Sequence, residues 1–343
     1  MFVRPLSQLV GFLMLGALAI TPCIAMAEPT SGGTQEVPQA VRDVLPSIVK
    51  ISAQISPRAR SASTLGAERE GQGVVIGDDG LVLTIGYLIL EAEEVVVTWG
   101  NGRKLPASVV AYDYETGFGL IRAAIPLKVP SVRLGDSDPL ATKDDTWVAG
   151  YGGEATAYHV LVASRREFAG FWEYLLENAI FTTPPYPMFA GAPLLSPKGE
   201  LLGIGSLVVP DALGSGHHNI PGNLFVPINR LKPILAGLLQ KGRSDGQPKP
   251  WLGIYVLEEL GRVTIANVAD GGPAAAAGLL RGDIVAAING QPVTEIAELY
   301  RKLWGMGNAG IEVRLQVERA TVMREFTVKT ADRYKFLRLD NSY

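Results

Sequence analysis

Short apolar runs separated by turn-forming residues fill the first two thirds of the chain. Residues 47–54 alternate apolar and polar side chains, as a half-buried strand does. Two further runs, 73–76 and 81–84, flank the turn Gly77-Asp78-Asp79-Gly80, and an Asp-Gly pair between such runs is typical of a hairpin. Similar runs occupy 95–99, 105–111 and 118–122. Short strands at this spacing predict an all-β sandwich or barrel.

Polar stretches and helix signals separate these strands from the rest of the chain. Residues 37–44 predict a short helix before Pro46, and residues 56–71, which lack an apolar period, predict a long surface loop. Asn229 is placed to cap a helix that runs to about Gln240. Residues 241–250 are polar and contain two prolines, so we expect an interdomain linker there.

A different pattern begins at Trp251. Residues 273–278 start with Pro and end with Gly, as a short helix often does. Thr294 is expected to cap a second helix that runs to about Trp304. Its apolar side chains fall on one face of that helix: Ile296, Leu299 and Leu303. The last residues, 332–343, are mixed in character and predict a C-terminal tail.

The composition is that of an ordinary globular protein. Of 343 residues, 47% are apolar and 19% are charged, and this length fits two or three domains. The net charge is −3, and there is no dense run of Lys or Arg. A nucleic-acid-binding protein needs a basic stripe, so we expect no nucleic acid among the partners.

The N-terminus has the features of a secretory signal peptide. Arg4 supplies a positive charge, residues 9–20 form an apolar core too short to span a bilayer, and Ala25-Met26-Ala27 is a small-residue cleavage site. Cleavage would leave a mature chain that starts at Glu28, without a transmembrane segment. An uncleaved anchor is the alternative, and a lipoprotein signal at Cys23 is disfavoured by the preceding proline. The prediction is an exported protein, with the periplasm as its compartment.

The mature chain contains no cysteine, because the single one lies in the signal peptide. Disulfides and thiolate metal sites are therefore excluded. Neighbouring side chains on a strand point apart, so the pair His217-His218 predicts a solvated loop rather than a metal site. We expect neither a metal nor a cofactor.

Three motifs resemble the trypsin-like serine proteases of the HtrA/Deg family. Gly71-Gln72-Gly73-Val74-Val75-Ile76 and Gly80-Leu81-Val82-Leu83-Thr84 are similar to the family's paired strands before its catalytic histidine. Leu134-Gly135-Asp136-Ser137 is similar to the family's entry into its second barrel. The resemblance implies a mostly β fold, with a chymotrypsin-like double β-barrel.

The same resemblance aligns the family's catalytic positions with unusual residues. Tyr87 stands at the position of the general base, Gly117 at that of the orienting aspartate and Ala190 at that of the serine nucleophile. Met188 stands at the position of the oxyanion-hole glycine. A triad needs a hydroxyl, an imidazole and a carboxylate, so the resemblance implies no catalytic residue and a chain that is not an enzyme. A rescue by Ser196 or Ser206 would need a base that the sequence does not indicate.

The C-terminal third resembles a PDZ domain of the HtrA type, a small β-barrel with two helices. The motif is carried by Trp251-Leu252-Gly253-Ile254 and by the run Arg281 to Gly290. In this resemblance, the N–H groups of Leu252, Gly253 and Ile254 hold a C-terminal carboxylate and the second helix walls the groove. The implied peptide-binding residues are Trp251, Leu252, Gly253, Ile254, Ile296, Leu299 and Leu303.

These observations predict a domain order along the chain. It comprises a signal peptide (1–27), a leader with first strand and loop (28–70), the rest of a first barrel (71–140), a second barrel with closing helix (141–240), a linker (241–250), a PDZ domain (251–331) and a tail (332–343).

The expected function is that of a pseudoprotease. The protein would bind protein C-termini or unfolded segments as an adaptor, chaperone or regulator, as a homo-oligomer such as a trimer or in a mixed oligomer with an active relative. The alternatives are an active HtrA-type endopeptidase of periplasmic protein quality control and a structural platform of an envelope complex.

Overall fold

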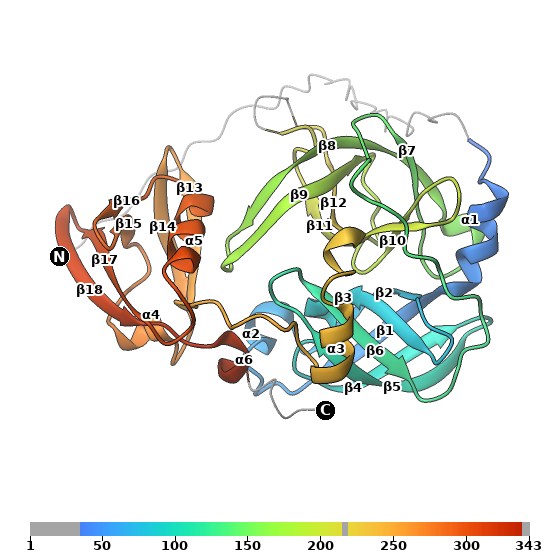
Figure 1. Ribbon diagram of the computed structural model, residues 1–343, viewed down its shortest axis with the longest axis horizontal. Coiled ribbons are helices and arrows are strands. Elements are labelled where there is room, and N and C mark those ends of the chain that lie inside the picture. The colour runs from blue at the N-terminus through green and yellow to red at the C-terminus, as the bar shows by residue number, and fades with distance from the viewer. Residues whose placement is uncertain (1–34, 215–218, 338–343) are drawn as a thin grey trace, which may run out of the picture. The chain divides into compact units, whose positions relative to one another are not determined.

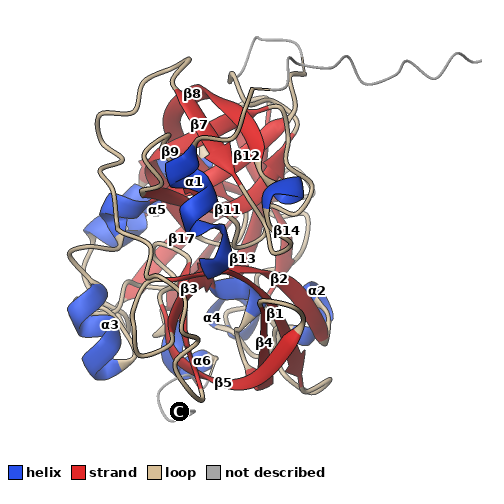
Figure 2. Ribbon diagram, turned by 90° about the vertical axis from the view of Figure 1, so that its right-hand side faces the viewer, coloured by secondary structure: helices blue, strands red, loops and turns tan. Residues whose placement is uncertain are grey.

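The computed structural model describes residues 35–214 and 219–337. The predicted signal peptide, the first part of the leader, the pair His217-His218 and the end of the tail lie outside the described residues. Figure 1 labels the elements in chain order, and Figure 2 shows that strands account for most of the regular structure, with short helices beside them.

The first barrel is closed by six strands in the order β1-β2-β3-β6-β5-β4. A short helix, α1 (Gln39–Val44), and a 3-10 turn over Leu45–Ser47 precede it. Strand β3 is buried on both faces, so its neighbours Val82 and Leu83 are both fully buried, as is Leu120, which pairs with Leu83. The strands are β1 (Ile48–Ile55), β2 (Glu68–Val75), β3 (Leu81–Ile85), β4 (Ala92–Trp99), β5 (Arg103–Tyr112) and β6 (Phe118–Ala123).

The predicted surface loop over 56–71 is only partly a loop. It contains the short helix α2 (Ala62–Leu65), and β2 already begins at Glu68. Arg69 explains why the polar sequence misled the prediction: its side chain is buried, and its guanidinium donates to the carbonyl oxygens of Tyr87 and Leu90 at 2.7 and 2.9 Å. A buried cation can occupy a strand position when carbonyl oxygens accept its hydrogen bonds. The pattern of apolar residues in the sequence does not reveal such a position.

The second barrel is closed by the strand order β10-β11-β12-β9-β8-β7. The strands are β7 (Asp145–Val148), β8 (Tyr158–Gly170), β9 (Tyr174–Thr183), β10 (Pro193–Leu195), β11 (Leu201–Val209) and β12 (Gly222–Pro227). A 3-10 turn over Glu154–Thr156 follows β7. Strands β8 and β9 form a long hairpin whose turn, Gly170 to Tyr174, is central to the site described below.

Asn229 does not cap the helix after the second barrel, which corrects the sequence prediction. It lies in a 3-10 turn, Ile228–Arg230, and its side-chain amide donates to Asp136 Oδ1 at 2.6 Å. The helix itself, α3, spans only Leu235–Lys241. The amide therefore joins the closing segment to the Leu134–Ser137 motif instead of starting a helix.

The C-terminal domain is a sheet in the order β13-β14-β15-β17-β18, with β16 paired to β15. The elements are β13 (Ile254–Glu259), β14 (Arg262–Val268), α4 (Pro273–Ala276), β15 (Ile284–Ile288), β16 (Gln291–Pro292), α5 (Ile296–Gly305), β17 (Glu312–Arg319) and β18 (Val322–Lys329). Glu295, not Thr294, stands at the N-cap position of α5, and the Thr294 N–H donates to Glu298 Oε2 at 3.0 Å.

The predicted tail begins with a packed helix. Helix α6 (Arg333–Phe336) follows β18, and Tyr334 and Leu337 are buried in one apolar cluster with Leu90 and Tyr114 of the first barrel. The tail prediction is therefore wrong for residues 333–337, because the apolar side chains of this short segment pack against the first barrel.

Candidate functional site

The structure places Tyr87 in the 3-10 turn Gly86–Leu88 that follows β3. Its hydroxyl donates a 2.8 Å hydrogen bond to the carbonyl oxygen of Ser206 in β11. Burial raises the pKa of the Tyr87 phenol above its ordinary value. The hydroxyl therefore keeps its proton at neutral pH and serves as a hydrogen-bond donor between the two barrels.

Gly117 lies in the turn between β5 and β6 with a φ of 85°, a left-handed conformation that favours glycine. Its carbonyl oxygen accepts a 2.7 Å hydrogen bond from the N–H of Gly86. This bond places the Gly117 turn directly beside the turn that carries Tyr87.

Ala190 lies in the turn between β9 and β10, packed against the apolar core. Its carbonyl oxygen accepts from the N–H of Gln72 at 2.7 Å, and the next residue, Gly191, donates to the carbonyl of Gly205 at 2.9 Å. Tyr87 and the Ala190 turn are thus bonded to neighbouring residues of β11. The structure brings the three aligned positions together between the barrels, while Met188 projects outward and is 41% exposed.

A second group of polar atoms converges at the start of the C-terminal domain. The N–H groups of Leu252, Gly253 and Ile254 all donate to the carboxylate of Glu173, with distances of 2.9 Å to Oε2 and of 2.7 and 3.0 Å to Oε1. Gly253 has a φ of 78°, which turns its N–H toward the same point as its neighbours. The three N–H groups named in the sequence analysis therefore converge on one point, where a carboxylate of this chain is bound.

Glu173 comes from the turn of the β8–β9 hairpin and is only 3% exposed. Burial raises the pKa of its carboxyl to about 7, against the opposing effect of the N–H groups of Leu252 and Ile254, which favour the ionised form. The loop supplies the donors that water would otherwise provide. The cost of burying this acid is thus partly offset by three hydrogen bonds.

The backbone of the same turn pairs with β13. The N–H of Val256 donates to the carbonyl oxygen of Phe171 at 2.9 Å. The Tyr300 hydroxyl, from α5, donates to the carbonyl of Gly170 at 2.8 Å and accepts from the N–H of Glu173 at 3.0 Å. The hairpin turn is therefore held from both sides, by the edge strand β13 and by helix α5; Figure 1 shows the β8–β9 tip facing these two elements.

The remaining predicted peptide-binding residues lie elsewhere. The backbone of Trp251 bonds to Ala331, and its ring packs on Phe336 with centroids 4.5 Å apart. The three apolar residues of α5 are buried in the core of the domain: Ile296, Leu299 and Leu303. Trp251 is thus a packing residue beside α6, and the three α5 residues belong to the apolar core of the domain.

Sequence reasoning missed Glu173 and Tyr300. Glu173 lies among aromatic residues of a hairpin turn, and no local pattern marks it as a ligand of a loop that begins 79 positions later. Tyr300 lies beside the predicted apolar face of α5 and is buried with it. This position in the helical period is the signal in the sequence that could have indicated its burial.

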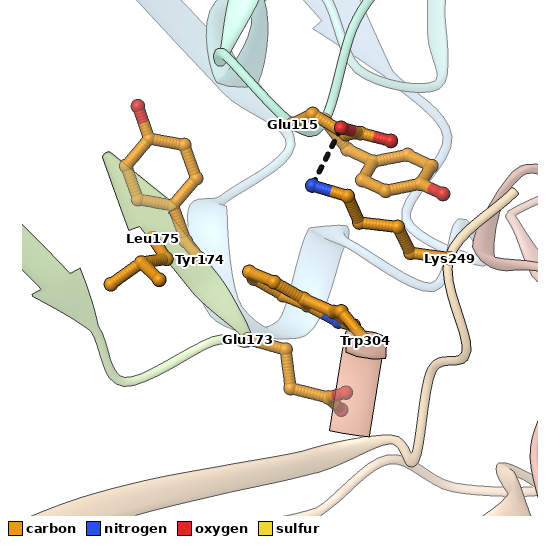
Figure 3. Close-up of a pocket in the computed structure, with 7 residues that line it drawn as sticks. Glu115, Glu173, Tyr174, Leu175, Lys249 and Trp304 are labelled. Atoms are coloured by element: carbon orange, nitrogen blue, oxygen red, sulfur yellow. Dashed lines mark ion pairs between the residues drawn. The ribbon is translucent and has the colours of Figure 1, made fainter. Parts of the chain in front are cut away.

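A small pocket adjoins Glu173, as shown in Figure 3. Lys249, in the predicted linker, forms a 2.7 Å ion pair with Glu115 of the first barrel, and its ammonium lies 4.6 Å from the centre of the Trp304 ring of α5. The pocket wall therefore includes a link between the first barrel and the C-terminal domain. Within the described ranges, no three His, Cys, Asp or Glu side chains are grouped to hold a metal ion.

Comparison with known families identifies both parts of the chain. Residues 71–204 match the model of the trypsin-like peptidase domain, and residues 250–330 match that of the PDZ domain. Among curated proteins, a "Probable periplasmic serine endoprotease DegP-like" of Pseudomonas putida is 28% identical over 76% of this chain and 54% of its own length. The protein of the same name from Halomonas elongata is 26% identical over 76% of this chain and 56% of its length. The chain thus spans about half the length of these relatives.

Solved structures show the same fold. The HtrA-type protease AlgW with decapeptide superposes with a TM-score of 0.51 at 21% identity, over 86% of this chain and 98% of that one. The serine endoprotease from Yersinia pestis gives 0.51 at 20% identity, over 86% of this chain and 97% of that one. The chain thus contains a trypsin-like peptidase domain followed by a PDZ domain. In this combination it is similar to the HtrA/DegP proteins.

These findings decide the predicted fold class and the predicted location. The fold class is confirmed: mostly β, with a trypsin-like protease domain and a PDZ domain. The exported, periplasmic location is confirmed, because the relatives are named periplasmic. No helix of the described residues is long and apolar enough to cross a membrane.

The prediction that the chain is not an enzyme is contradicted. It was drawn from the side chains at four aligned positions, whereas the relatives that match 76% of this chain are named serine endoproteases. The prediction that the chain is not an enzyme is therefore withdrawn.

Proposed function

We propose that this periplasmic HtrA-type protein binds protein C-termini or unfolded segments through its PDZ domain, as an adaptor, chaperone or regulator. The observation that supports it most is the convergence of the Leu252, Gly253 and Ile254 N–H groups on one carboxylate. A C-terminal carboxylate has the same two oxygens and the same charge as the Glu173 side chain. The loop is therefore chemically suited to the end of another chain.

The edge strand β13 supplies the second requirement of peptide binding. It terminates the sheet order, so its outer edge is not paired with another strand of that sheet. An extended peptide can add to such an edge through main-chain hydrogen bonds. The bond that the Val256 N–H donates to the Phe171 carbonyl supports this proposal, because it joins an edge group of β13 to a backbone segment outside the sheet.

The test is a binding titration with paired peptides. A fluorescent peptide with a free C-terminal carboxylate is compared with the same peptide ending in an amide, on the mature chain and on the variant Gly253→Glu. We expect the wild type to bind the peptide acid but not the amide, and Gly253→Glu to bind neither. A side chain at position 253 is strained at a φ of 78°, and the glutamate adds a negative charge that repels the peptide carboxylate. Equal binding of acid and amide would refute recognition of a C-terminus.

Hydrolysis of unfolded proteins is the second candidate function, and the names of the relatives favour it. The expected result is that purified mature protein fragments unfolded casein and that Tyr87→Phe abolishes the fragmentation. Ser206→Ala is the companion variant, because Tyr87 donates a hydrogen bond to the backbone carbonyl of this residue. Intact casein after prolonged incubation with the folded protein would count against this candidate.

Assembly into a homo-oligomer such as a trimer, or into a mixed oligomer with a relative, is proposed alongside these functions. Light scattering of the mature protein, alone and mixed with a relative, measures both cases. If deletion of residues 251–329 left envelope-complex formation intact, the result would support the alternative of a structural platform and would count against peptide binding.

A further inference from the structure

The hairpin turn occupies the PDZ groove in the register of a C-terminal peptide. The Glu173 carboxylate fills the loop, and Phe171, two residues earlier, bonds to Val256, two residues beyond the last loop donor. The turn runs toward the loop while β13 runs away from it, so the two segments are antiparallel. Only the carboxylate differs in origin: it belongs to a side chain and not to a chain end.

We propose that the turn from Gly170 to Glu173 is a built-in ligand of the PDZ groove, and that a partner's C-terminus binds only by displacing it. This inference rests on the proposed peptide-binding function. The two ligands cannot coexist, because all three N–H donors of the loop are already used by Glu173. A backbone N–H has one proton to donate, so a second carboxylate finds no partner until the first has left.

Further contacts hold the turn in place. Arg301 of α5 forms an ion pair with Glu167 on β8, and Arg333 Nη1 donates to the carbonyl of Trp172 at 3.2 Å. The Trp172 ring stacks on Tyr174 with centroids 5.3 Å apart. These contacts join the hairpin to α5 and to the α6 segment, so the turn is presented to the groove even before its carboxylate binds.

Tethering sets the strength of the competition. A ligand on the same chain acts at an effective concentration in the millimolar range. The apparent affinity for an external peptide is the intrinsic affinity reduced by the fraction of grooves that are open. The intact protein is therefore expected to bind peptides weakly, and a variant that releases the turn to bind them at least about tenfold more tightly.

The register also indicates the class of partner. The Phe171 ring is 51% exposed and lies 6.3 Å from the Tyr255 ring of β13, centre to centre. A displacing peptide places its own side chain at this position, two residues before its terminal residue. The favoured partner is a C-terminus with an aromatic side chain two residues before the end.

The experiment uses the full mature chain and a fluorescein-labelled decapeptide that ends in Phe-Trp-Val with a free carboxylate. Fluorescence anisotropy gives its Kd for the wild type, for Glu173→Ala and for Glu177→Ala. Glu173→Ala removes the carboxyl group that fills the loop. Glu177→Ala is the matched control, because this exposed acid lies on the same hairpin and pairs with Arg230. We expect at least about tenfold tighter binding in Glu173→Ala and no change in Glu177→Ala.

Two results overturn the inference in different ways. Equal affinity in the wild type and in Glu173→Ala removes the built-in ligand but keeps peptide binding. No binding in any of the three proteins removes peptide binding as well, so the two failures are distinguishable.

Hydrogen exchange provides a second measurement that needs no peptide. The amides of Leu252, Gly253 and Ile254 should be protected in the wild type and should exchange faster in Glu173→Ala, with the rest of the PDZ domain unchanged. Equal exchange in both proteins would contradict the proposal. Thermal unfolding establishes that each variant is folded.

Discussion

The carboxylate of Glu173 accepts a 2.7 Å hydrogen bond from the N–H of Gly253, although 80 positions separate the two residues. One belongs to a hairpin of the second barrel and the other to the first loop of the PDZ domain. The bond makes the occupancy of the groove a property of both domains together. Four measurements test this arrangement and the parts of the fold that support it.

Peptide binding should strengthen as the pH rises from about 4 to about 7. Burial raises the pKa of the docked Glu173 carboxyl to about 7, whereas a free glutamate titrates near 4.3. Protonation therefore favours the docked turn: its stabilisation is complete below the free pKa and is lost as the pH rises through the docked value. A peptide terminus stays ionised over this range because its pKa is near 3.5.

Anisotropy titrations of the Phe-Trp-Val peptide at several pH values check this prediction. The charged or titratable groups that face Glu173 are Arg333, Tyr300 and Tyr255, and burial raises the pKa of both phenols, so Glu173 is the group that titrates. Binding to Glu173→Gln should be independent of pH across the same window. A parallel pH dependence in that variant would assign the effect to another group.

Tyr300→Phe should loosen the docked turn. The substitution removes the hydroxyl that serves the Gly170 carbonyl and the Glu173 N–H, leaving two buried polar groups without a partner. The expected loss is about 1–3 kcal/mol of unfolding free energy, measured by urea denaturation. Tyr255→Phe is the control, because the Tyr255 hydroxyl makes no hydrogen bond within the described residues. Similar losses in both variants would argue against a specific clamp.

Gly191→Ala should destabilise the junction between the barrels. A Cβ added at Gly191 would lie 2.0 Å from the Gln72 carbonyl oxygen, and the φ of 74° is unfavourable for any side chain. Gly153→Ala is the matched control, with a φ of 78° and open space around the added carbon. We expect the control to cost about 1–3 kcal/mol for the backbone alone, and Gly191→Ala to lower the melting temperature clearly further. Equal shifts would show that the junction relaxes freely.

Asp283→Asn should destabilise the PDZ domain, and acid should do so in the wild type. Burial raises the pKa of Asp283, but hydrogen bonds from Arg319, at 2.6 and 2.7 Å, and from the Leu280 N–H outweigh this and leave the pKa below its ordinary value. A lowered pKa means stability that is present above about pH 4 and is lost as the pH falls through the native value.

Urea denaturation at pH 7 and at pH 3 measures both effects. Asp283→Asn should cost about 1–3 kcal/mol at pH 7, because it leaves the guanidinium of Arg319 without its charged partner. The loss of stability on acidification should be smaller in the variant than in the wild type. An unchanged acid response would show that another carboxyl controls it.

Much of the fold followed from local patterns. The alternating run over 47–54 and the short apolar runs up to residue 122 predicted the strands of the first barrel, because these strands bury one or both of their faces. The second barrel was implied by the family resemblance. The pattern Trp251-Leu252-Gly253-Ile254 located the carboxylate loop, since only glycine readily turns the backbone there. The resemblance also placed Tyr87, Gly117 and Ala190 at positions that the structure brings together.

The sequence by itself determined the strands, the order of the domains and the donors of the loop, because these depend on residues that are neighbours along the chain. Only the tertiary structure decided what fills the loop. The chain has 34 acidic residues, and nothing near Glu173 distinguishes it from the others. The same reason explains the wrong assignments of Asn229, Trp251 and Tyr334. Each of these residues is held by a partner far away in the sequence, and such a contact produces no local period or motif.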